Sequence, residues 1–354
     1  MKKILIGLVG LVIVLGAAFA LFRGAILERA IPRIMEQRLM ADLVGDLPDG
    51  LHVFVCGAGS PMPNPNAGGP CLTVIAGKSV YMVDAGTGGI RTMALNGINA
   101  SSVKGVLLTH FHSDHIDGLG ETQMLRWAQG GHTTRLPIYG PTGVERIAKG
   151  INITYMQDFT YRVAHHGEDI VPPSGAGVTP QPFEVPAEGE AVAVLEDGDL
   201  TVVAFSVDHS PVSPAVGYLF TYKDRSVLIS GDTSKSDNLE HFAKDVDLLM
   251  HEGLAPNLVG LMEQAAKNAG QPRTAKLFHD ILDYHASPKE AAQTAQAAGA
   301  DMLGFYHIVP PILLAPMEDL YLEGVADAYD GPVVMSEDGM FYHLPAGSDE
   351  ISVK

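Results

Sequence analysis

The sequence predicts an α/β fold, because short apolar runs of strand length alternate with segments of helical pattern. Strand-like runs dominate up to residue 110 and return between residues 191 and 230, whereas helical patterns such as residues 289–298 come later. The chain has 354 residues, 46% of them hydrophobic, and shows no internal repeat. It can therefore bury a substantial core within one large domain.

The first 22 residues differ from the rest of the chain. Lys2 and Lys3 precede residues 4–22, which carry no charge and are long enough for a helix that crosses a bilayer. Residues 18–20, Ala-Phe-Ala, also resemble a site at which a signal peptide is cleaved. Since lysines favour the inner side of a membrane, both interpretations predict an exported protein, either membrane-anchored and facing the periplasm or exterior, or periplasmic or secreted after cleavage. Arginines after residue 22 weaken that argument and leave a main domain on the inner side as the alternative.

The remaining chain divides into a linker and a main domain. Residues 1–22 are predicted to be the signal peptide or membrane anchor, residues 23–50 an amphipathic linker helix, and residues 51–354 the main domain.

Residues 165–190 are rich in Pro, Gly and Glu and predict an irregular insertion, which either shapes access to a site or is a plain surface loop. Cys56 and Cys71 lie near the ends of two β-like runs, so a disulfide and two buried free thiols are both open.

Four side chains that can bind a metal stand close together after the apolar run of residues 106–109. The segment is His110-Phe-His112-Ser-Asp114-His115. Imidazole nitrogen and carboxylate oxygen suit Zn²⁺ and similar ions, and a loop after a strand can aim alternate side chains at one point. Because four ligands are too many for one open catalytic ion, the segment predicts two ions, with the first two histidines on one and the last two residues on the other.

Three later runs of strand type each deliver one more ligand-type residue. Residues 202–207 are followed by His209, residues 226–230 by Asp232, and residues 301–306 by His307. Metal ligands are usually carried on loops that rigid strands hold in place. Each residue alone would be an ordinary loop residue, but their order after the histidine-rich segment predicts that they complete one metal site.

These motifs resemble those of the metallo-β-lactamase-fold hydrolases, from about residue 51 to about residue 345. The segment from His110 to His115 matches that family's HxHxDH signature, and residues 53–61 and 81–88 look like its first strands. The likeness is greatest to the branch that holds the tRNA 3′-end-processing endonucleases (tRNase Z, ribonuclease Z) with the related arylsulfatases and phosphodiesterases. It rests on residues 69–70, 139–141, 208–211, 231–233, 251–252 and 285–288. The resemblance implies a four-layer αβ/βα sandwich, with two sheets face to face, helices outside and the metals at one edge. In this chain the N-terminal hydrophobic helix of the signal or anchor segment would precede it.

The resemblance also implies a cofactor of two divalent ions, with zinc as the first candidate and manganese and iron as the others. Two such ions lower the pKa of a bridging water toward neutrality and clamp the attacking and leaving oxygens of an ester. The implied ligands are His110, His112 and His209 for one ion and Asp114, His115 and His307 for the other, with Asp232 as the bridge.

Two catalytic residues follow from the same resemblance. Asp114 would orient or deprotonate the water besides binding a metal, and His285 would protonate the leaving oxygen. A structural alternative for His285 is a neighbour of a helix cap, because residues 287–290 have the pattern of a helix start. Asp84 resembles the family's carboxylate that fixes the tautomer of a ligand histidine, with a plain turn residue as the alternative.

Charge bears on the expected substrate. The chain carries 41 acidic and 23 basic residues, a net charge of −18, and no cluster of Lys or Arg follows residue 40. Binding a nucleic-acid backbone usually requires a basic surface. The tRNA-processing members also carry a protruding arm, in many bacterial forms between the motifs of His209 and Asp232, where this chain has room for one hairpin only. We therefore expect nucleic acid to be an unlikely partner and a small anionic ester to be the substrate.

The first expectation for function is a dimetal hydrolase of a small sulfate ester or phosphodiester, most similar to an arylsulfatase. The alternatives are a cyclic-nucleotide or other small phosphodiesterase or a ribonuclease Z-like endonuclease, then a lactonase, and last an inactive binding module, which would normally have lost ligands. The sequence does not indicate the oligomeric state.

Overall fold

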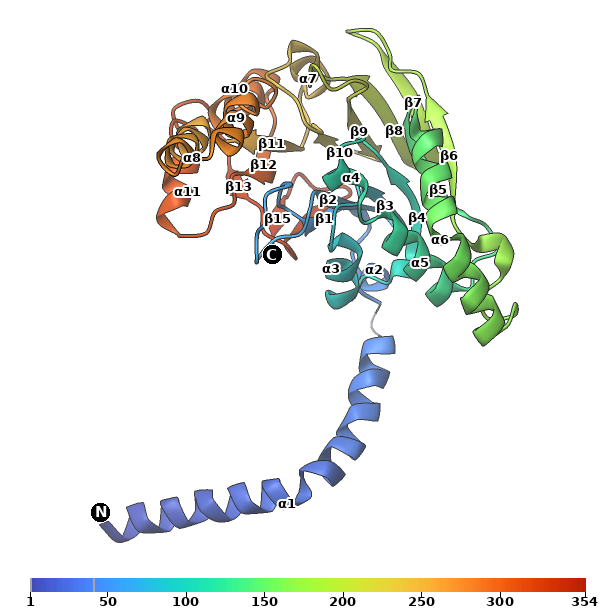
Figure 1. The fold of residues 1–354 in the computed structure, drawn as a ribbon, viewed down its shortest axis with the longest axis vertical. Coiled ribbons are helices and arrows are strands. Elements are labelled where there is room, and N and C mark those ends of the chain that lie inside the picture. Colours follow the sequence, from blue (N-terminus) through green and yellow to red (C-terminus); the bar gives the residue numbers. More distant parts are fainter. Residues whose placement is uncertain (1, 41) are drawn as a thin grey trace. The chain divides into compact units, whose positions relative to one another are not determined.

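The structure, a computed structural model, describes residues 2–40 and 42–354 (Figure 1). The chain divides into two compact units, residues 1–43 and 44–354. Helix α1 (Lys2–Met40) continues past residue 22, α2 covers Leu43–Asp46, and the first strand begins at Gly50. The division at residues 22 and 50 therefore remains a prediction. Most side chains of the predicted signal or anchor segment, residues 1–22, lie outside the described residues. In the part of the chain that was described, no helix combines the length and apolar character needed to cross a membrane.

Two β-sheets form the second unit. Within the described residues, the first sheet has eight strands in the order β15-β14-β1-β2-β3-β4-β5-β6, and the second has seven in the order β13-β12-β11-β10-β9-β8-β7. The first sheet consists of β1 (Gly50–Gly57), β2 (Cys71–Ala76), β3 (Ser79–Val83), β4 (Val103–Leu107), β5 (Leu136–Pro141), β6 (Val178–Phe183), β14 (Phe341–Pro345) and β15 (Ser352–Val353). The second consists of β7 (Ala191–Asp197), β8 (Leu200–Ser206), β9 (Val216–Tyr222), β10 (Arg225–Ile229), β11 (Leu248–Leu254), β12 (Met302–Val309) and β13 (Val333–Met335).

Helices lie against the outer faces of both sheets (Figure 1). On the first sheet they are α3 (Gly89–Leu95), α5 (Leu119–Gly130) and α6 (Val144–His166), and on the second α7 (Asp237–Phe242), α10 (Pro288–Ala298) and α11 (Pro316–Tyr321). The short helix α4 (Ser113–Ile116) follows β4, and α8 (Pro256–Asn268) packs on α9 (Pro272–Asp280). Two 3-10 turns cover Ala100–Ser102 and Pro173–Gly175. The predicted α/β fold with two sheets is confirmed.

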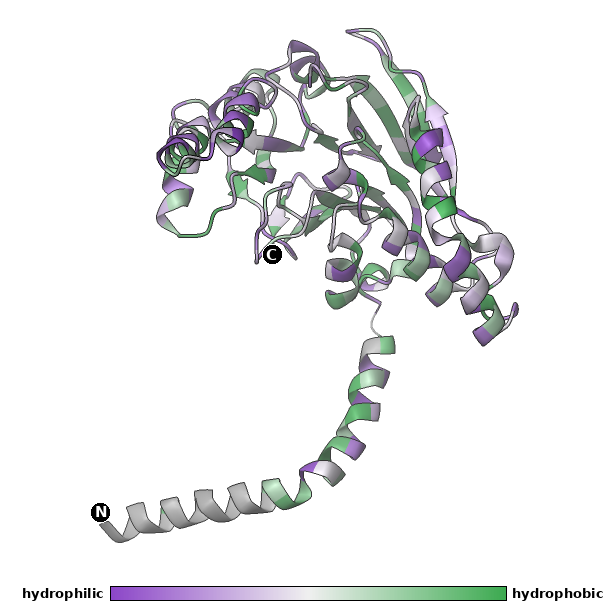
Figure 2. Ribbon diagram, in the orientation of Figure 1, coloured by the Kyte–Doolittle hydropathy of each residue, from purple (hydrophilic) through white to green (hydrophobic). Residues whose placement is uncertain are grey.

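The main core lies between the two sheets. Val53 and Val74 of the first sheet and Val202 and Val227 of the second belong to one buried cluster. In Figure 2 the strands are mainly green, the colour of hydrophobic residues, whereas the helices outside them are banded green and purple. This is the pattern expected when strands are buried on both faces and helices on one. Burial of this apolar surface holds the strand ends in fixed positions, and those ends carry the candidate site.

The structure decides the state of the two cysteines and corrects the expectation for residues 165–190. Cys56 and Cys71 form a disulfide, because the antiparallel pairing of β1 and β2 brings their Cα atoms to 5.0 Å. Residues 165–190, which we expected to be irregular, contain β6, paired in parallel with β5. Pro180 and Pro182 concealed this strand, since proline is tolerated at a sheet edge although it donates no hydrogen bond.

Candidate metal centre

The histidine-rich segment lies where β4 ends. His110 and His112 stand on the loop, and Asp114 and His115 stand on α4 directly after it. The other predicted ligands come from the second sheet, where His209 follows β8, Asp232 follows β10 and His307 lies in β12. All of them are buried except His112, which is half-buried. The two sheets therefore deliver the residues to one shared edge.

The predicted ligands fall into two groups of ligand-type atoms, and a third group joins His285 to Asp232 and His307. In each group, one atom per residue lies within 4.8 Å of the others, and the first two groups are His110, His112, His209 and Asp232, and Asp114, His115 and His307. The structure thus brings all the predicted ligands together. Which ion each of them binds remains a prediction.

Asp232 lies between the two groups. Its Oδ2 atom is 3.4 Å from Nε2 of both His115 and His307. The same oxygen is 3.8 Å from Nε2 of His110 and 3.9 Å from Nε2 of His209. One carboxylate oxygen therefore faces imidazoles of both groups, which is the position that a bridging ligand requires.

The donor atoms fit metal ions. Several of them are buried and have no hydrogen-bond partner among the described residues, namely Oδ2 of Asp114, Nε2 of His115, Nε2 of His209, Oδ1 of Asp232 and both ring nitrogens of His307. Leaving a buried polar atom unpaired costs about 1–3 kcal/mol. A group of such atoms in one place therefore requires a partner that the surrounding side chains do not supply. Imidazole nitrogens with carboxylate oxygens are the donor set that zinc and similar divalent ions prefer.

The Asp84 carboxylate binds the ring of His115 on the side away from the predicted metal position. Its Oδ2 lies 2.8 Å from Nδ1 of His115 and accepts a hydrogen bond of 2.8 Å from the Thr109 hydroxyl, while Oδ1 accepts one from the Thr109 backbone N–H. A proton on Nδ1 leaves Nε2 of His115 free to bind a metal.

The backbone φ is 58° at Asp84 and 45° at His307, in the left-handed region that non-glycine residues rarely adopt. Such strain is typical of functional sites.

His285 stands beside the centre and pairs with Glu252. Its Nδ1 lies 3.0 Å from Oε1 of Glu252, and its ring stacks on that of His307 with centroids 5.5 Å apart. Burial alone lowers the pKa of His285, but the Glu252 carboxylate and then Asp232 raise it to about 9. Glu252 belongs to the motif of residues 251–252, but no local pattern around it indicates a partner. Glu252 is fully buried in β11, and its proximity to His285 depends on how the loop before α10 packs on that strand.

Burial and charge keep three of the ligand-type groups, His110, His209 and Asp232, in the forms that bind metals. Burial holds the pKa of His110 well below its usual range and lowers that of His209, so both rings favour the neutral state. Burial alone raises the pKa of Asp232, yet the charges of His307 and His115 hold it well below its usual range. His209 also places its Nδ1 2.8 Å from the Tyr284 carbonyl, which leaves its Nε2 facing the site.

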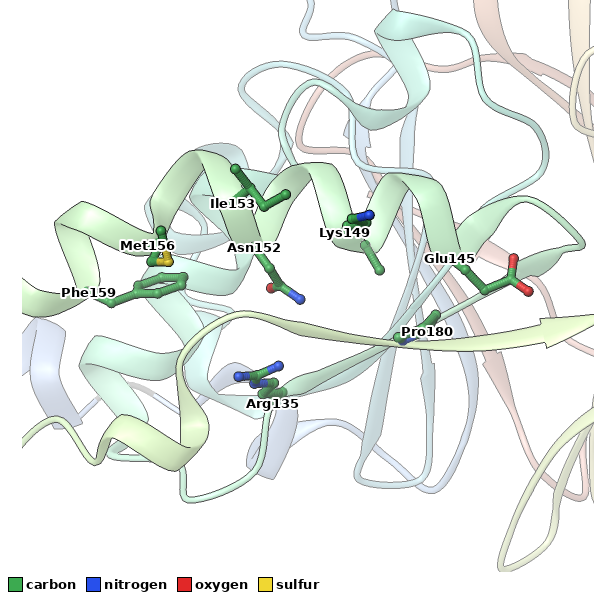
Figure 3. A pocket seen from close by; sticks show the side chains of 9 residues that line it. Arg135, Glu145, Lys149, Asn152, Ile153, Met156, Phe159 and Pro180 are labelled. Atoms are coloured by element: carbon green, nitrogen blue, oxygen red, sulfur yellow. The ribbon is translucent and has the colours of Figure 1, made fainter.

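A cavity of about 230 Å³ opens at the metal centre and is lined by His112, Asp114, Asp232, His285 and His307 together with two serines, Tyr284 and apolar residues. A separate hollow of about 470 Å³ lies between α6 and the strands β5 and β6 (Figure 3). Its lining includes Arg135, Lys149 and Asn152 but none of the ligand-type residues of the metal centre. Chemistry at the metals therefore belongs to the first cavity.

Comparison with known proteins places this geometry in a family. A family model described as "Beta-lactamase superfamily domain" matches residues 81–308. Ribonuclease Z of Mycobacterium bovis (strain BCG / Pasteur 1173P2) is 34% identical over 264 residues, which are 74% of this chain and 87% of that protein. The chain belongs to the metallo-β-lactamase superfamily. Ribonuclease Z of Mycolicibacterium paratuberculosis (strain ATCC BAA-968 / K-10) is 32% identical to this superfamily member over 290 residues, 81% of this chain and 96% of the relative.

Solved structures agree on the fold. The crystal structure of human tRNase Z, short form, superposes with a TM-score of 0.59 at 21% identity and covers 83% of this chain and 99% of its own. The metallo-β-lactamase-fold protein YhfI from Bacillus subtilis gives a TM-score of 0.57 at 22% identity over 83% and 99%. The predicted family resemblance is confirmed, and this superfamily member is a metal-dependent hydrolase of ester bonds with a dimetal site.

The relatives overturn two expectations. Nucleic acid, expected to be an unlikely partner, is what a ribonuclease acts on by name, so that expectation is wrong. The physical reason is that net charge describes the whole surface, whereas two divalent ions make the field within the site positive. The expected localisation, an exported enzyme that is membrane-anchored, periplasmic or secreted, is overturned as well. It rested only on the pattern of the first 22 residues, whereas the relatives are ribonuclease Z proteins. The expected arylsulfatase activity is not supported by these relatives.

Proposed function

We propose that this superfamily member is a metal-dependent phosphodiesterase and that RNA is its first substrate class, as the name of its ribonuclease Z relatives suggests. The observation that carries the proposal is the position of Asp232, whose Oδ2 lies within 3.9 Å of imidazoles from both ligand groups. A carboxylate placed in this way suits two neighbouring ions, and two-metal sites are a common solution for in-line displacement at phosphorus.

The protein's part in this chemistry begins with holding the centre rigid. When bound, the two ions would supply Lewis-acid stabilisation of the phosphate charge and a water of lowered pKa. His110, His112 and His209 would hold one ion, and Asp114, His115 and His307 the other. The hydrogen bond from His115 to Asp84 would keep Nε2 unprotonated and directed at the site. Asp114 would orient the attacking water with its carboxylate.

His285 is proposed to donate the proton that the leaving oxygen needs. Glu252 accepts a hydrogen bond from Nδ1 of His285, so Nε2 is the ring atom available to the substrate. The ring lines the cavity at the metal centre, where a phosphodiester would lie. Removal of the negative charge from a leaving alkoxide by such a group contributes about 10²–10⁴ in rate.

Small phosphodiesters form a second candidate substrate class. The interval between His209 and Asp232 is filled by β9 and β10, an antiparallel hairpin whose strands are joined at residues 223–224. No protruding arm is inserted in this described interval. Tight binding of a long RNA would therefore need another surface, whereas a small diester needs only the cavity.

The test uses the full chain loaded with zinc. The assay compares a precursor tRNA with a 3′ extension, bis-nitrophenyl phosphate and nitrophenyl sulfate, each with and without EDTA. We expect chelator-sensitive cleavage of the RNA or the diester, and loss of that cleavage in His112→Ala. Turnover of the sulfate alone would contradict the proposal, and so would diester cleavage that survives in chelated His112→Ala protein.

A further inference from the structure

An apolar pocket adjoins the metal cavity. It has a volume of about 600 Å³, and its lining includes Pro61, Met62, Leu277, Phe278, Ile281 and Leu313. Every lining residue is hydrophobic, so no side chain there can pair with a phosphate or a hydroxyl. The size is within the range of about 300–1,000 Å³ that is typical of ligand pockets.

The pocket adjoins the catalytic cavity. Pro61, Met62 and Ile281 line both hollows. The wall between an anionic group at the metals and the apolar space is therefore formed by residues that contact both. A ligand whose head lies at the metals and whose chain reaches the pocket would therefore meet only apolar side chains at the boundary between the two.

The floor and the rim of the pocket differ in exposure. Pro310 and Pro311 are buried beneath it, and Phe278 and Ile281 pack on a buried cluster that contains Leu254 and Val309. At the rim, Leu277 is 65% exposed and Leu313 is 57% exposed. Large apolar side chains held open to water beside a preformed pocket mark a surface that an apolar ligand can cover.

We propose that this pocket binds a hydrocarbon substituent on one ester oxygen of a phosphodiester, so that the enzyme also acts on phosphodiesters with an alkyl chain. This inference rests on the proposed phosphodiesterase function. The reaction is unchanged, since water adds its oxygen to phosphorus, one P–O ester bond breaks and the released alcohol takes a proton. The pocket adds affinity by removing the chain from water, and it contributes nothing to ligands that lack one.

The test measures binding separately from turnover. Ethyl-, butyl- and octylphosphonate, below their micelle concentrations, are titrated by calorimetry into the zinc-loaded full chain. The phosphonate head is a probe for the metal centre, and the chain is the only variable. We expect affinity to rise by about two- to fourfold for each methylene that enters the pocket, with an increasingly negative heat-capacity change of binding as apolar surface is buried.

Two leucines provide a matched pair of variants. Leu277 on α9 lines the pocket, whereas Leu261 on α8 does not, and both side chains are 65% exposed. Leu277→Asp should abolish the dependence of affinity on chain length, while Leu261→Asp, with the same change of charge and residue type, should preserve it. Leu313→Asp, on the loop before α11, should act like Leu277→Asp and shows whether the effect belongs to the pocket or to one helix.

The outcomes separate this inference from the proposed function. Equal affinities for ethyl- and octylphosphonate, or the same dependence on chain length in the Leu277 and Leu261 variants, would overturn the apolar pocket as a binding site. Failure of the protein to cleave both the precursor tRNA and methyl nitrophenyl phosphate would instead refute the phosphodiesterase function. Cleavage of that short diester together with steep dependence on chain length supports both.

Discussion

The metal cavity and the hollow beside α6 differ in how their polar atoms are satisfied. In the α6 hollow, the half-buried Asn152 amide donates a hydrogen bond to the Val178 carbonyl and accepts one from the Val178 N–H, so it is paired within the chain. At the metal centre, buried nitrogens and oxygens of Asp114, His209 and His307 lack such partners among the described residues. The α6 hollow is the larger, at about 470 Å³ against about 230 Å³. Volume is therefore a poorer guide to chemistry than unsatisfied polar atoms are.

The largest contrast is expected from the bridging carboxylate. Asp232→Asn should lower kcat/KM on a phosphodiester by about 10³-fold or more, since an amide cannot replace a charged ligand to both ions. Lys149→Ala in the α6 hollow should leave kcat/KM within about twofold. Steady-state kinetics on both variants, with thermal unfolding as the check on folding, measures the difference. Equal losses of kcat/KM in the two variants would mean that the metal cavity is no more important for catalysis than the α6 hollow.

His285 should show a smaller effect that leaves the metals in place. His285→Gln keeps a polar side chain but cannot donate a proton as an imidazolium does, so kcat should fall by about 10²–10³-fold. Metal content per chain should stay unchanged. A loss of metal in this variant would instead assign His285 to the ligand set. This is the specific alternative, because His285 forms a group of ligand-type atoms with Asp232 and His307.

Asp84 should affect affinity rather than chemistry. Asp84→Asn weakens the hydrogen bond that fixes the tautomer of His115, and loss of such a partner typically costs about 10–100-fold in metal affinity. Competition with a zinc-binding dye measures this. At saturating zinc, most of the activity should return. An unchanged zinc affinity would mean that Asp84 is a plain turn residue.

The smallest expected effect is on the free energy of unfolding, and it comes from His343, which is not one of the predicted metal ligands. Burial, and then the charge of His52, lower the pKa of His343 to about 4. Because this value lies below the usual 6.5, the unfolded chain takes up the proton first, so the stabilising contribution present above pH 6.5 is lost as pH falls toward 4. The full linkage is about 3 kcal/mol, and solvent screening at this half-exposed ring reduces the expected loss to about 1–2 kcal/mol. Urea unfolding of metal-free protein should show a weaker pH dependence in His343→Phe, and identical profiles would contradict this account.

The sequence predicted the parts of the site that local spacing determines. His110 to His115 follow one strand within six residues, and His209 and Asp232 each follow a run that β8 and β10 bear out. The helix start after His285 is also confirmed, since Ser287 and Glu290 form a capping box at α10. These features depend on period and capping chemistry, which a single sequence displays.

The rest depended on contacts between distant segments. Glu252 meets His285 across 33 residues, and nothing in either local pattern indicates the pairing. The apolar pocket combines residues 61–63 with parts of α8, α9 and the loop before α11, each of which alone has the composition of ordinary core or surface. The excess of acidic residues pointed away from nucleic acid because net charge carries no information on the field at a site that holds cations.

The central claim, that the two ligand groups hold two ions joined by Asp232, is tested most directly by metal content. Zinc bound per chain is measured by mass spectrometry after dialysis, in the wild type and in Asp232→Asn. The account predicts two zinc ions per wild-type chain, a clear loss in the variant, and activity that returns with the second ion during a zinc titration. One tightly bound ion with full activity, or two ions retained in Asp232→Asn, would contradict it.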